Sequence, residues 1–430
     1  MKIHLKALGC RLNEAELEQW SQKFRNSGHQ IVQSSPDADV VVLNTCAVTN
    51  EASGKSRRLM NRLYRDNPTA KLVVSGCYAT LQAEKVADNL GVDLIVPNDQ
   101  KDQLPEQVMK AFELPIMPKI VTEPGESGLF IRGRHRAFIK IQDGCRYRCT
   151  FCIVTVARGE ERSRLEADII DEINQLSQQG IQEIVLTGVH VGGYGSDLES
   201  SSLYSLVQRV LAETDIPRIR FASVEPWDLP DNFFALFSDT RLMPHMHLPI
   251  QSGADSVLRR MARRCKTSEF TSLLEQARRD VPGFNVTTDI IVGFPGEIEE
   301  EWAETMAYVE QTGFGHIHIF TYSVREGTKA ARLDNRVAES VRKQRSQALH
   351  QLAEQLKQNW FAEQLGQSAD VLWERRKEEG GQVFYSGYTP NYCKVIAQTD
   401  ISVALENQIT PVYLDSLDAA GAALKGKLVL

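Results

Sequence analysis

The chain has 430 residues, of which 42% are hydrophobic and 24% charged, and its formal net charge is -7. This length predicts about three ordinary domains, and the composition excludes a largely disordered chain. The acidic balance argues against a protein that wraps nucleic acid over its whole surface, although it permits a local basic face. No apolar run approaches the roughly 20 residues of a membrane span, so we expect a cytoplasmic protein with no membrane partner.

The first expected domain, residues 1–115, alternates apolar runs with helical patterns, which predicts a Rossmann- or flavodoxin-like parallel sheet. Asn13 and Glu16 match a capping box at the start of its first helix. Cys10, Cys46 and Cys77 each end an apolar run. Since the carboxyl ends of parallel strands share one edge, we expect these thiols to converge there, although small buried hydrophobic side chains are the alternative. The runs are "KIHLKALGC", "DVVVLNTC", "KLVVSGCY" and "VDLIVP".

The second expected domain, residues 131–361, contains six apolar runs with helical spacers, which predicts a partial (β/α)6 barrel. Barrel enzymes place their chemistry on the loops that follow the strands. The segment "GCRYRCTFC" follows the first of these runs and contains Cys145, Cys149 and Cys152. The six runs are "AFIKIQ", "EIVLTGV", "RIRFASVEP", "HMHLPIQ", "NVTTDIIVGF" and "HIHIFTYSV".

The third expected domain, residues 364–430, follows a charged helical segment and is rich in short strand patterns with Gly and Pro turns. These patterns predict a small antiparallel β-barrel. Its aromatic residues suit stacking on exposed RNA bases, although core packing explains about half of them. These residues are Phe384, Tyr385, Tyr388 and Tyr392, and the strand patterns are "ADVLWERR", "QVFYSGYT", "YCKVIAQ" and "QITPVYLDSL".

The three closely spaced cysteines have two chemical interpretations. A four-iron cluster usually takes one thiolate per iron, so three thiolates leave one iron open to a substrate or cosubstrate. Zinc is the main alternative because Cys-x2-Cys is a common zinc half-site, but no second pair follows at zinc-finger spacing. The Gly-rich "GVHVGGYGSD" lacks the phosphate-loop pattern, and we treat Cys265 and Cys393 as non-ligands.

The spacing Cys145-x3-Cys149-x2-Cys152, with Phe151 before the last cysteine, resembles the signature of radical S-adenosylmethionine enzymes. The resemblance implies a [4Fe-4S] cluster on these thiolates, with S-adenosylmethionine bound to the open iron and cleaved by one electron to a 5'-deoxyadenosyl radical. Strand-end motifs similar to those of the family add the remaining cofactor contacts. The cofactor-binding residues so implied are Phe151, Thr187 and Gly188 of "LTGV", Gln251 and Ser252 of "PIQSG", and Ile291, Gly293 and Pro295 of "TDIIVGFPGE".

The N-terminal cysteines and the terminal barrel narrow the resemblance to the methylthiotransferases, over essentially the whole chain. The segments "LGCRLNEAE", "NTCAVTNEA" and "SGCYA" are similar to that family's N-terminal motifs. The resemblance implies a second [4Fe-4S] cluster on Cys10, Cys46 and Cys77, which carries the sulfur to be inserted, and a terminal RNA-binding TRAM domain. Replacing an unactivated C–H by C–S offers no acid–base route, so a radical that acts beside a sulfur-bearing cluster is chemically sensible. The clusters carry this chemistry, and we assign no catalytic side chain.

Two segments, "NTCAVTNEA" and "GYTPNYCKV", are most similar to the branch that modifies N6-threonylcarbamoyladenosine at tRNA position 37. The implied enzyme is a tRNA (N6-L-threonylcarbamoyladenosine(37)-C2)-methylthiotransferase that binds the anticodon loop. It needs an external electron donor and a sulfur donor that the sequence does not identify. The alternatives are the same chemistry on N6-isopentenyladenosine or on a ribosomal-protein aspartate, and a non-catalytic iron–sulfur RNA-binding regulator.

The segment from Arg132 to Arg164 has nine basic and three acidic residues, and nine minus three gives a local charge of +6. This reversal of the overall charge predicts a surface for a polyanion near the catalytic entrance. Two helical stretches, Lys55 to Arg65 and Arg259 to Arg264, add arginines, although a solvated face explains them equally well.

Overall fold

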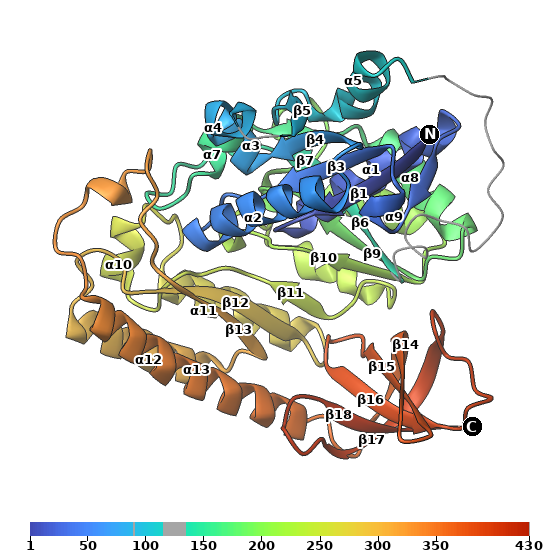
Figure 1. Cartoon of the computed structure of the whole chain (residues 1–430). Coiled ribbons are helices and arrows are strands. Elements are labelled where there is room, and N and C mark those ends of the chain that lie inside the picture. The colour runs from blue at the N-terminus through green and yellow to red at the C-terminus, as the bar shows by residue number, and fades with distance from the viewer. Residues whose placement is uncertain (89–90, 115–134, 430) are drawn as a thin grey trace.

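The structure is a computed structural model that describes residues 1–88, 91–114 and 135–429, and Figure 1 shows the arrangement of its elements. Arg132 and Arg134 of the basic segment, and the expected boundary between the first two domains, lie outside the described residues. None of the described helices combines the length and the apolar character that crossing a bilayer requires.

The N-terminal region is a five-stranded, fully parallel sheet with the order β2-β1-β3-β4-β5. This order is flavodoxin-like, as the sequence predicts. Alternate residues of β3 face opposite sides, so Val41 and Leu43 join one hydrophobic core while Val40 and Val42 join the other. The strands are β1 (Lys2–Ala7), β2 (Gln30–Val32), β3 (Val40–Thr45), β4 (Lys71–Gly76) and β5 (Val92–Val96), and the helices are α1 (Arg11–Asn26), α2 (Asn50–Asp66), α3 (Cys77–Leu81), α4 (Ala83–Ala87) and α5 (Leu104–Ala111).

The middle region contains six strands that follow one another in space as they do in sequence. Two parallel sheets, β10-β9-β6 and β11-β12-β13, are linked by the parallel bridges Ile219–Leu242 and Ser223–His247. The result is the expected partial barrel of parallel strands, with helices on its outside (Figure 1). The strands are β6 (Arg136–Lys140), β9 (Glu183–Thr187), β10 (Arg218–Phe221), β11 (His245–His247), β12 (Asn285–Val292) and β13 (His316–Thr321).

Seven helices and a small strand pair complete the described part of this region. The pair β7 (Gln142–Asp143) and β8 (Arg162–Ser163) is antiparallel and encloses the cysteine loop. The long helix α13 packs along β13 and leads to the terminal barrel (Figure 1). The helices are α7 (Val154–Arg158), α8 (Glu166–Gln178), α9 (Leu203–Glu213), α10 (Asp255–Arg260), α11 (Thr267–Asp280), α12 (Glu299–Thr312) and α13 (Glu339–Ala362). Short 3-10 turns are η1 (Ser35–Asp37), η2 (Lys101–Gln103), η3 (Val191–Gly193), η4 (Pro226–Asp228), η5 (Phe233–Ser238) and η6 (Ala330–Arg332).

The C-terminal region is a closed five-stranded barrel with the order β14-β15-β16-β18-β17. Its pairings are antiparallel except for β16 with β18, which is parallel. Closure leaves no long strand edge open to another chain. The strands are β14 (Ser368–Glu379), β15 (Gln382–Tyr388), β16 (Lys394–Thr399), β17 (Ile409–Leu417) and β18 (Leu424–Leu428).

The loop between β15 and β16 docks on the partial barrel of the middle region. The ring of Tyr392 stacks on His245 at 4.7 Å and on Tyr388 at 4.8 Å. Arg136 and Arg220 lie over the same ring, at 5.3 Å and 5.0 Å from its centre. Tyr388 and Tyr392 therefore join the two regions instead of facing solvent for RNA bases. Tyr385 is a core residue that is 1% exposed, so packing explains it too.

We predict that Tyr392→Ala lowers the free energy of unfolding by about 2 kcal/mol, because it removes two ring stacks and two cation–π contacts. Tyr413→Ala is the matched control, since this tyrosine of the same barrel is 42% exposed. Urea unfolding under anaerobic conditions measures both variants. Equal, small losses for the two would show that the docked loop contributes nothing to stability.

Candidate functional site

The three N-terminal cysteines lie at one edge of the parallel sheet, as predicted. Cys10, Cys46 and Cys77 follow the carboxyl ends of β1, β3 and β4, which are neighbours in the sheet. Cys46 and Cys77 are buried, while Cys10 is exposed. All three side chains line one cavity with a volume of about 630 Å³. Ligands bind at this edge of open parallel sheets.

Two glycines allow the sulfur atoms to approach. Gly9 has a φ of +117°, and a Cβ there would meet Sγ of Cys46 at 2.8 Å. Gly76 has a φ of +96°, and a Cβ there would meet the carbonyl oxygen of Thr45 at 2.3 Å. Only glycine combines this backbone conformation with such close contacts. The glycines of "LGC" and "SGC" are thus required by the geometry of the cysteine loops.

The second triad lies on the loop between β7 and α7. The amide of Cys145 donates to the carbonyl of Gly159 at 3.1 Å, and the amide of Cys152 donates to the carbonyl of Cys149 at 3.0 Å. Gly144 has a φ of +74°, and a Cβ there would meet the carbonyl oxygen of Glu160 at 1.9 Å. These contacts fold the loop back on itself, so that all three cysteines are partly accessible.

The 630 Å³ cavity extends from the N-terminal cysteines into the partial barrel. The inner faces of β6, β9, β10, β11, β12 and β13 all contribute to its wall. Thr187 and Gly188 at the end of β9 line it, as does Val154, two residues after Cys152. Tyr392 of the terminal barrel lines it as well. The N-terminal triad, the strand ends of the middle region and the docked loop therefore share one cavity.

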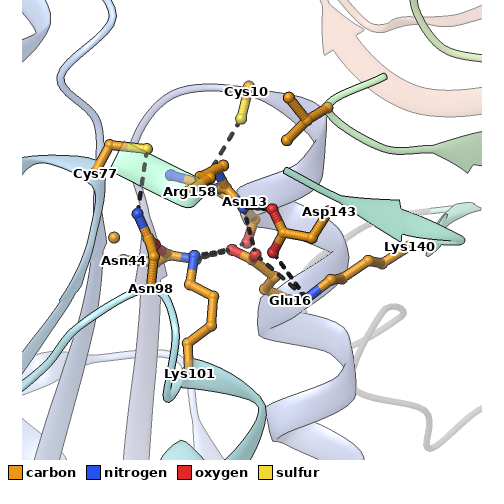
Figure 2. Close-up of polar contacts among 12 residues, drawn as sticks. Cys10, Asn13, Glu16, Asn44, Cys77, Asn98, Lys101, Lys140, Asp143 and Arg158 are labelled. Atoms are coloured by element: carbon orange, nitrogen blue, oxygen red, sulfur yellow. Dashed lines mark hydrogen bonds and ion pairs between the residues drawn. The ribbon is translucent and has the colours of Figure 1, made fainter. Parts of the chain in front are cut away.

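A buried cluster of charges joins the two cysteine loops (Figure 2). Arg158, six residues after Cys152, donates to Glu16 of α1, to Asp143 and to Asn13, each at 2.9 Å. Glu16 also accepts from Lys101 at 2.8 Å, and the side chains of these two residues are each 1% exposed. Lys140 pairs with Asp143 at 3.1 Å. In a low-dielectric interior such pairs hold only if every charge is matched, so the cluster fixes α1 against α7.

Two amides extend this cluster to the thiols. Asn13 is 1% exposed and accepts a long contact from Sγ of Cys10, at 3.6 Å, and Asn98 donates to Sγ of Cys77 at 3.7 Å. Asn98 also donates to the carbonyl of Ala157, next to Arg158, at 2.7 Å. Figure 2 shows the contact of Asn13 with Cys10 and that of Asn98 with Cys77. The N-terminal triad is therefore positioned partly by the loop that carries the second triad.

The capping box predicted for Asn13 and Glu16 is wrong. Helix α1 begins one residue after Cys10, which occupies the cap position and has no side-chain cap bond. Asn13 instead donates to the carbonyls of Leu8 and Thr45. Local spacing alone suggests a cap, but the tertiary partners Arg158 and Lys101 take these two side chains into the interior. Sequence reasoning missed the pairing of Asn13, Glu16, Lys101 and Arg158, because the partners lie far apart in the chain.

The basic segment is a weaker polyanion surface than its charge of +6 suggests. Arg136 pairs with Glu183 and Glu374, Arg158 with Glu16 and Asp143, and Arg164 with Glu172. Lys140 is buried with its acidic partners. Arg146 and Arg148 remain accessible but lie beside Glu161 and Glu160. Most of the positive charge in the described part of this segment is therefore neutralised within the fold.

The donor sets fit iron–sulfur clusters better than single ions. Tetrahedral zinc holds its thiolate sulfurs about 3.8 Å apart. Among the described residues, neither triad brings its three sulfur atoms within 4.8 Å of one another. Burial raises the pKa of Cys46 and of Cys152 to about 11, which favours the protonated thiol at these two positions. Binding of iron must displace these protons.

One tighter group exists in the described chain, formed by Cys145, Glu161 and His190. Burial alone would lower the pKa of His190, but hydrogen bonds to Asp228 and Glu161 outweigh burial and raise it to about 9. The bond from Nε2 to Asp228 is 2.6 Å long, and Nδ1 contacts Glu161. Both ring nitrogens of His190 are therefore engaged by carboxylates, and a metal ion would have to displace one of these bonds and its proton.

The predicted S-adenosylmethionine contacts lie in three environments. Thr187 and Gly188 line the cavity. Phe151 and Ile291 pack together against a small core near Cys152. The remaining four residues belong to strand-end turns: Gln251 has a φ of 80°, Ser252 is hydrogen-bonded to Thr305 at 3.2 Å, Gly293 donates its amide to Glu297 at 2.9 Å, and Pro295 is buried.

Comparison with known proteins adds independent information. The model of Uncharacterized protein family UPF0004 matches residues 2–97, and that of the Radical SAM superfamily matches residues 139–309. A threonylcarbamoyladenosine tRNA methylthiotransferase of Bacillus subtilis is 36% identical over 90% of this chain and 88% of its own length. Its namesake in Thermotoga maritima is 34% identical over 91% of this chain and 90% of its own. A tRNA-2-methylthio-N(6)-dimethylallyladenosine synthase of Bacillus licheniformis is 34% identical over 90% and 79%.

The chain belongs to the radical S-adenosylmethionine methylthiotransferases. This methylthiotransferase is an enzyme, and its predicted cofactors, [4Fe-4S] clusters and S-adenosylmethionine, are those of its family. Its fold also resembles a radical S-adenosylmethionine methyltransferase from Kitasatospora setae, solved with cobalamin and a [4Fe-4S] cluster bound. The TM-score is 0.56 at 16% identity, over 74% of both chains, so this likeness shows the fold alone.

We predict that Glu16→Gln destabilises this methylthiotransferase by about 3 kcal/mol, because it leaves Lys101 and Arg158 buried without their shared anion. Glu51→Gln is the control, since its partner Lys55 is exposed and such surface pairs contribute little to stability. Urea unfolding at neutral pH measures the difference. Losses of equal size in the two variants would contradict the importance of the buried cluster.

We also predict how the difference in stability between the unaltered protein and Glu16→Gln depends on pH. Burial would raise the pKa of Glu16, but Arg158, Lys101 and Lys140 together lower it from 4.5 to about 2. A lowered folded-state pKa stabilises above the unfolded value and loses that effect as the pH falls toward the folded value. The advantage of the unaltered protein over Glu16→Gln should therefore be constant above pH of about 4.5 and shrink below it.

Proposed function

We propose that this methylthiotransferase inserts a methylthio group at C2 of N6-threonylcarbamoyladenosine at position 37 of tRNA. The observation that carries the proposal is the shared cavity, which is lined by all three N-terminal cysteines and by Val154, two residues after Cys152. Two of the similar relatives are named for the same substrate. A cytoplasmic location is part of the proposal, because tRNA is found there.

We assign one [4Fe-4S] cluster to each cysteine triad. Cys145, Cys149 and Cys152 would hold the cluster that binds S-adenosylmethionine, with Phe151, Thr187, Gly188, Gln251, Ser252, Ile291, Gly293 and Pro295 around the cosubstrate. Cys10, Cys46 and Cys77 would hold the cluster that carries sulfur. When bound, these groups supply a radical that activates a C–H bond and a sulfur atom to replace the hydrogen. An external electron donor and a sulfur donor complete the reaction.

The protein's own contribution is to position the two cysteine loops and to enclose the site. The cluster of Arg158, Glu16 and Asp143 fixes the two cysteine loops relative to each other. The cavity partly encloses the N-terminal thiols, and such enclosure protects a reactive intermediate from side reactions. The expected domains, residues 1–115, 131–361 and 364–430, would then each supply one part: the sulfur-bearing site, the radical site and a surface for RNA.

Contacts with the tRNA anticodon loop have two candidate surfaces. Helix α2 follows the Cys46 loop and exposes Arg57, Arg58, Arg62 and Arg65, none of which has a carboxylate partner within ion-pair distance in the described chain. Such free cations suit phosphates. Phe320 lines the cavity and is 43% exposed, so it offers a stacking surface for an unpaired base. A base in a single-stranded loop reaches such a cavity without the cost of opening a helix.

We predict that Ala at Cys145, Cys149 and Cys152 removes one cluster, about four irons per chain, and abolishes reductive cleavage of S-adenosylmethionine. Ala at Cys10, Cys46 and Cys77 should remove the other four irons and preserve cleavage while stopping sulfur insertion. Iron and sulfide analysis with electron paramagnetic resonance measures this after anaerobic reconstitution. Loss of all iron from either folded variant, or one bound zinc in the unaltered protein, would refute the assignment.

We predict that tRNA carrying N6-threonylcarbamoyladenosine gains 2-methylthio product when incubated with the reconstituted protein, S-adenosylmethionine, sulfide and a reductant. Digestion to nucleosides and mass spectrometry identify the product. The matched substrates are tRNA with N6-isopentenyladenosine at the same position and the ribosomal protein. Product on either of these and none on the first tRNA would reassign the substrate while leaving the methylthiotransferase chemistry in place.

A further inference from the structure

The cavity contains four arginines, and three of them are already used by the fold. Arg158 is bound by Glu16 and Asp143. Arg136 is paired with Glu183 and Glu374, and Arg220 with Glu183. Arg220 also donates to two backbone carbonyls of the docked loop. Their guanidinium groups are therefore not available to a ligand without breaking buried pairs.

The fourth arginine, Arg11, is different. It is exposed, lines the cavity, and its guanidinium carbon lies 5.0 Å above the centre of the Phe138 ring on β6. No ion pair joins it to a carboxylate among the described residues. Two acids line the cavity: Glu14, three residues further along the same helix, and Asp289, which is paired with His247 at 3.1 Å. An arginine stacked on an aromatic face keeps its N–H donors free at the edge of the plane. The guanidinium group of Arg11 is thus available to a ligand in the cavity.

The position of Arg11 limits which part of a substrate it can meet. It directly follows Cys10, and our proposed function brings C2 of the adenine to the N-terminal triad. In adenine, C2 and the carbon that bears N6 both flank N1, so the N6 substituent lies on the same edge of the ring as C2. The sugar and its phosphates leave from the opposite side of the base. A group attached to N6 is therefore the part of the nucleoside that comes nearest to Arg11.

The threonylcarbamoyl substituent carries a carboxylate, whereas isopentenyl is neutral and apolar. A carboxylate accepts two parallel hydrogen bonds from a guanidinium, and a partly enclosed cavity strengthens such charged bonds. We propose that Arg11 binds the carboxylate of the N6-threonylcarbamoyl group and so determines the preference for this substrate. This inference rests on the proposed function. It makes Arg11 a specificity-determining residue.

The test is a double-mutant cycle between the protein and the RNA. The substrates are two anticodon stem–loop RNAs with threonylcarbamoyladenosine at position 37, one with the free carboxylate and one with the carboxamide, which keeps the shape and removes the charge. The reconstituted full-length protein is compared with R11Q and R11K by kcat/KM for the methylthio product. R11Q should lose about 10- to 100-fold on the carboxylate RNA, as for a charged hydrogen bond, and under about 3-fold on the carboxamide RNA. On the carboxylate RNA, the kcat/KM of R11K should lie between those of the unaltered protein and R11Q.

Arg57→Gln is the matched control, because Arg57 lies exposed on α2, where phosphate contacts are expected. It should lower kcat/KM equally for both RNAs. Equal losses for R11Q on both RNAs would identify a phosphate contact and overturn the inference. Iron content of each variant shows whether the neighbouring Cys10 still holds its cluster.

The unaltered protein decides the question even if R11Q fails to bind iron. It should convert the carboxylate RNA about 10- to 100-fold more efficiently than the carboxamide RNA. A ratio under about 3 would overturn the carboxylate contact while leaving the proposed function standing. No product on either RNA, with product on isopentenyladenosine RNA, would instead refute the proposed function itself.

Discussion

The pairing of Arg158 with Glu16 and Asp143, both of which accept from its Nη1, is the constraint on which the rest of the site depends. Glu16 belongs to the helix that follows Cys10, and Arg158 belongs to the short helix that follows Cys152. This connection helps to fix the separation of two cysteine loops that lie on separate sheets. A methylthiotransferase needs that separation fixed, because the radical and the sulfur act on one carbon atom. Hydrophobic packing of Ala15 against Phe138 and Val185 supports the same alignment.

The elements of regular structure were largely predictable from the sequence, and the exceptions have physical causes. The six runs of the partial barrel and the four runs of the N-terminal sheet all form strands, because buried parallel strands leave continuous apolar signals. The edge strand β2 has three residues, too few for a pattern. Strand β18 reads "LKGKL", in which lysine and glycine hide the strand that closes the barrel.

The candidate site was predictable where spacing carries chemistry and unpredictable where partners come from distant segments. Both cysteine triads were readable, one from its loop spacing and one from its strand ends. The pairing of Asn13 and Glu16 with Arg158 spans more than 140 positions, so local patterns indicated a helix cap instead. For the same reason the segment around Arg158 was interpreted as a basic surface, although its charges are mostly matched inside the fold. A count of charges along a segment does not include the partners that pair with them from other segments.

Helix α1 packs against residues that are translated at different times, which has a consequence for synthesis of the chain. One side of α1 packs on the N-terminal sheet. Ala15 of α1 instead packs against Phe138 and Val185, which are translated much later. At 5–20 residues per second the interval is on the order of ten seconds. During it, the emerged sheet already has its Glu16–Lys101 pair but not the wall that will enclose its three thiols. The N-terminal cysteines are therefore synthesised before the strands that enclose them.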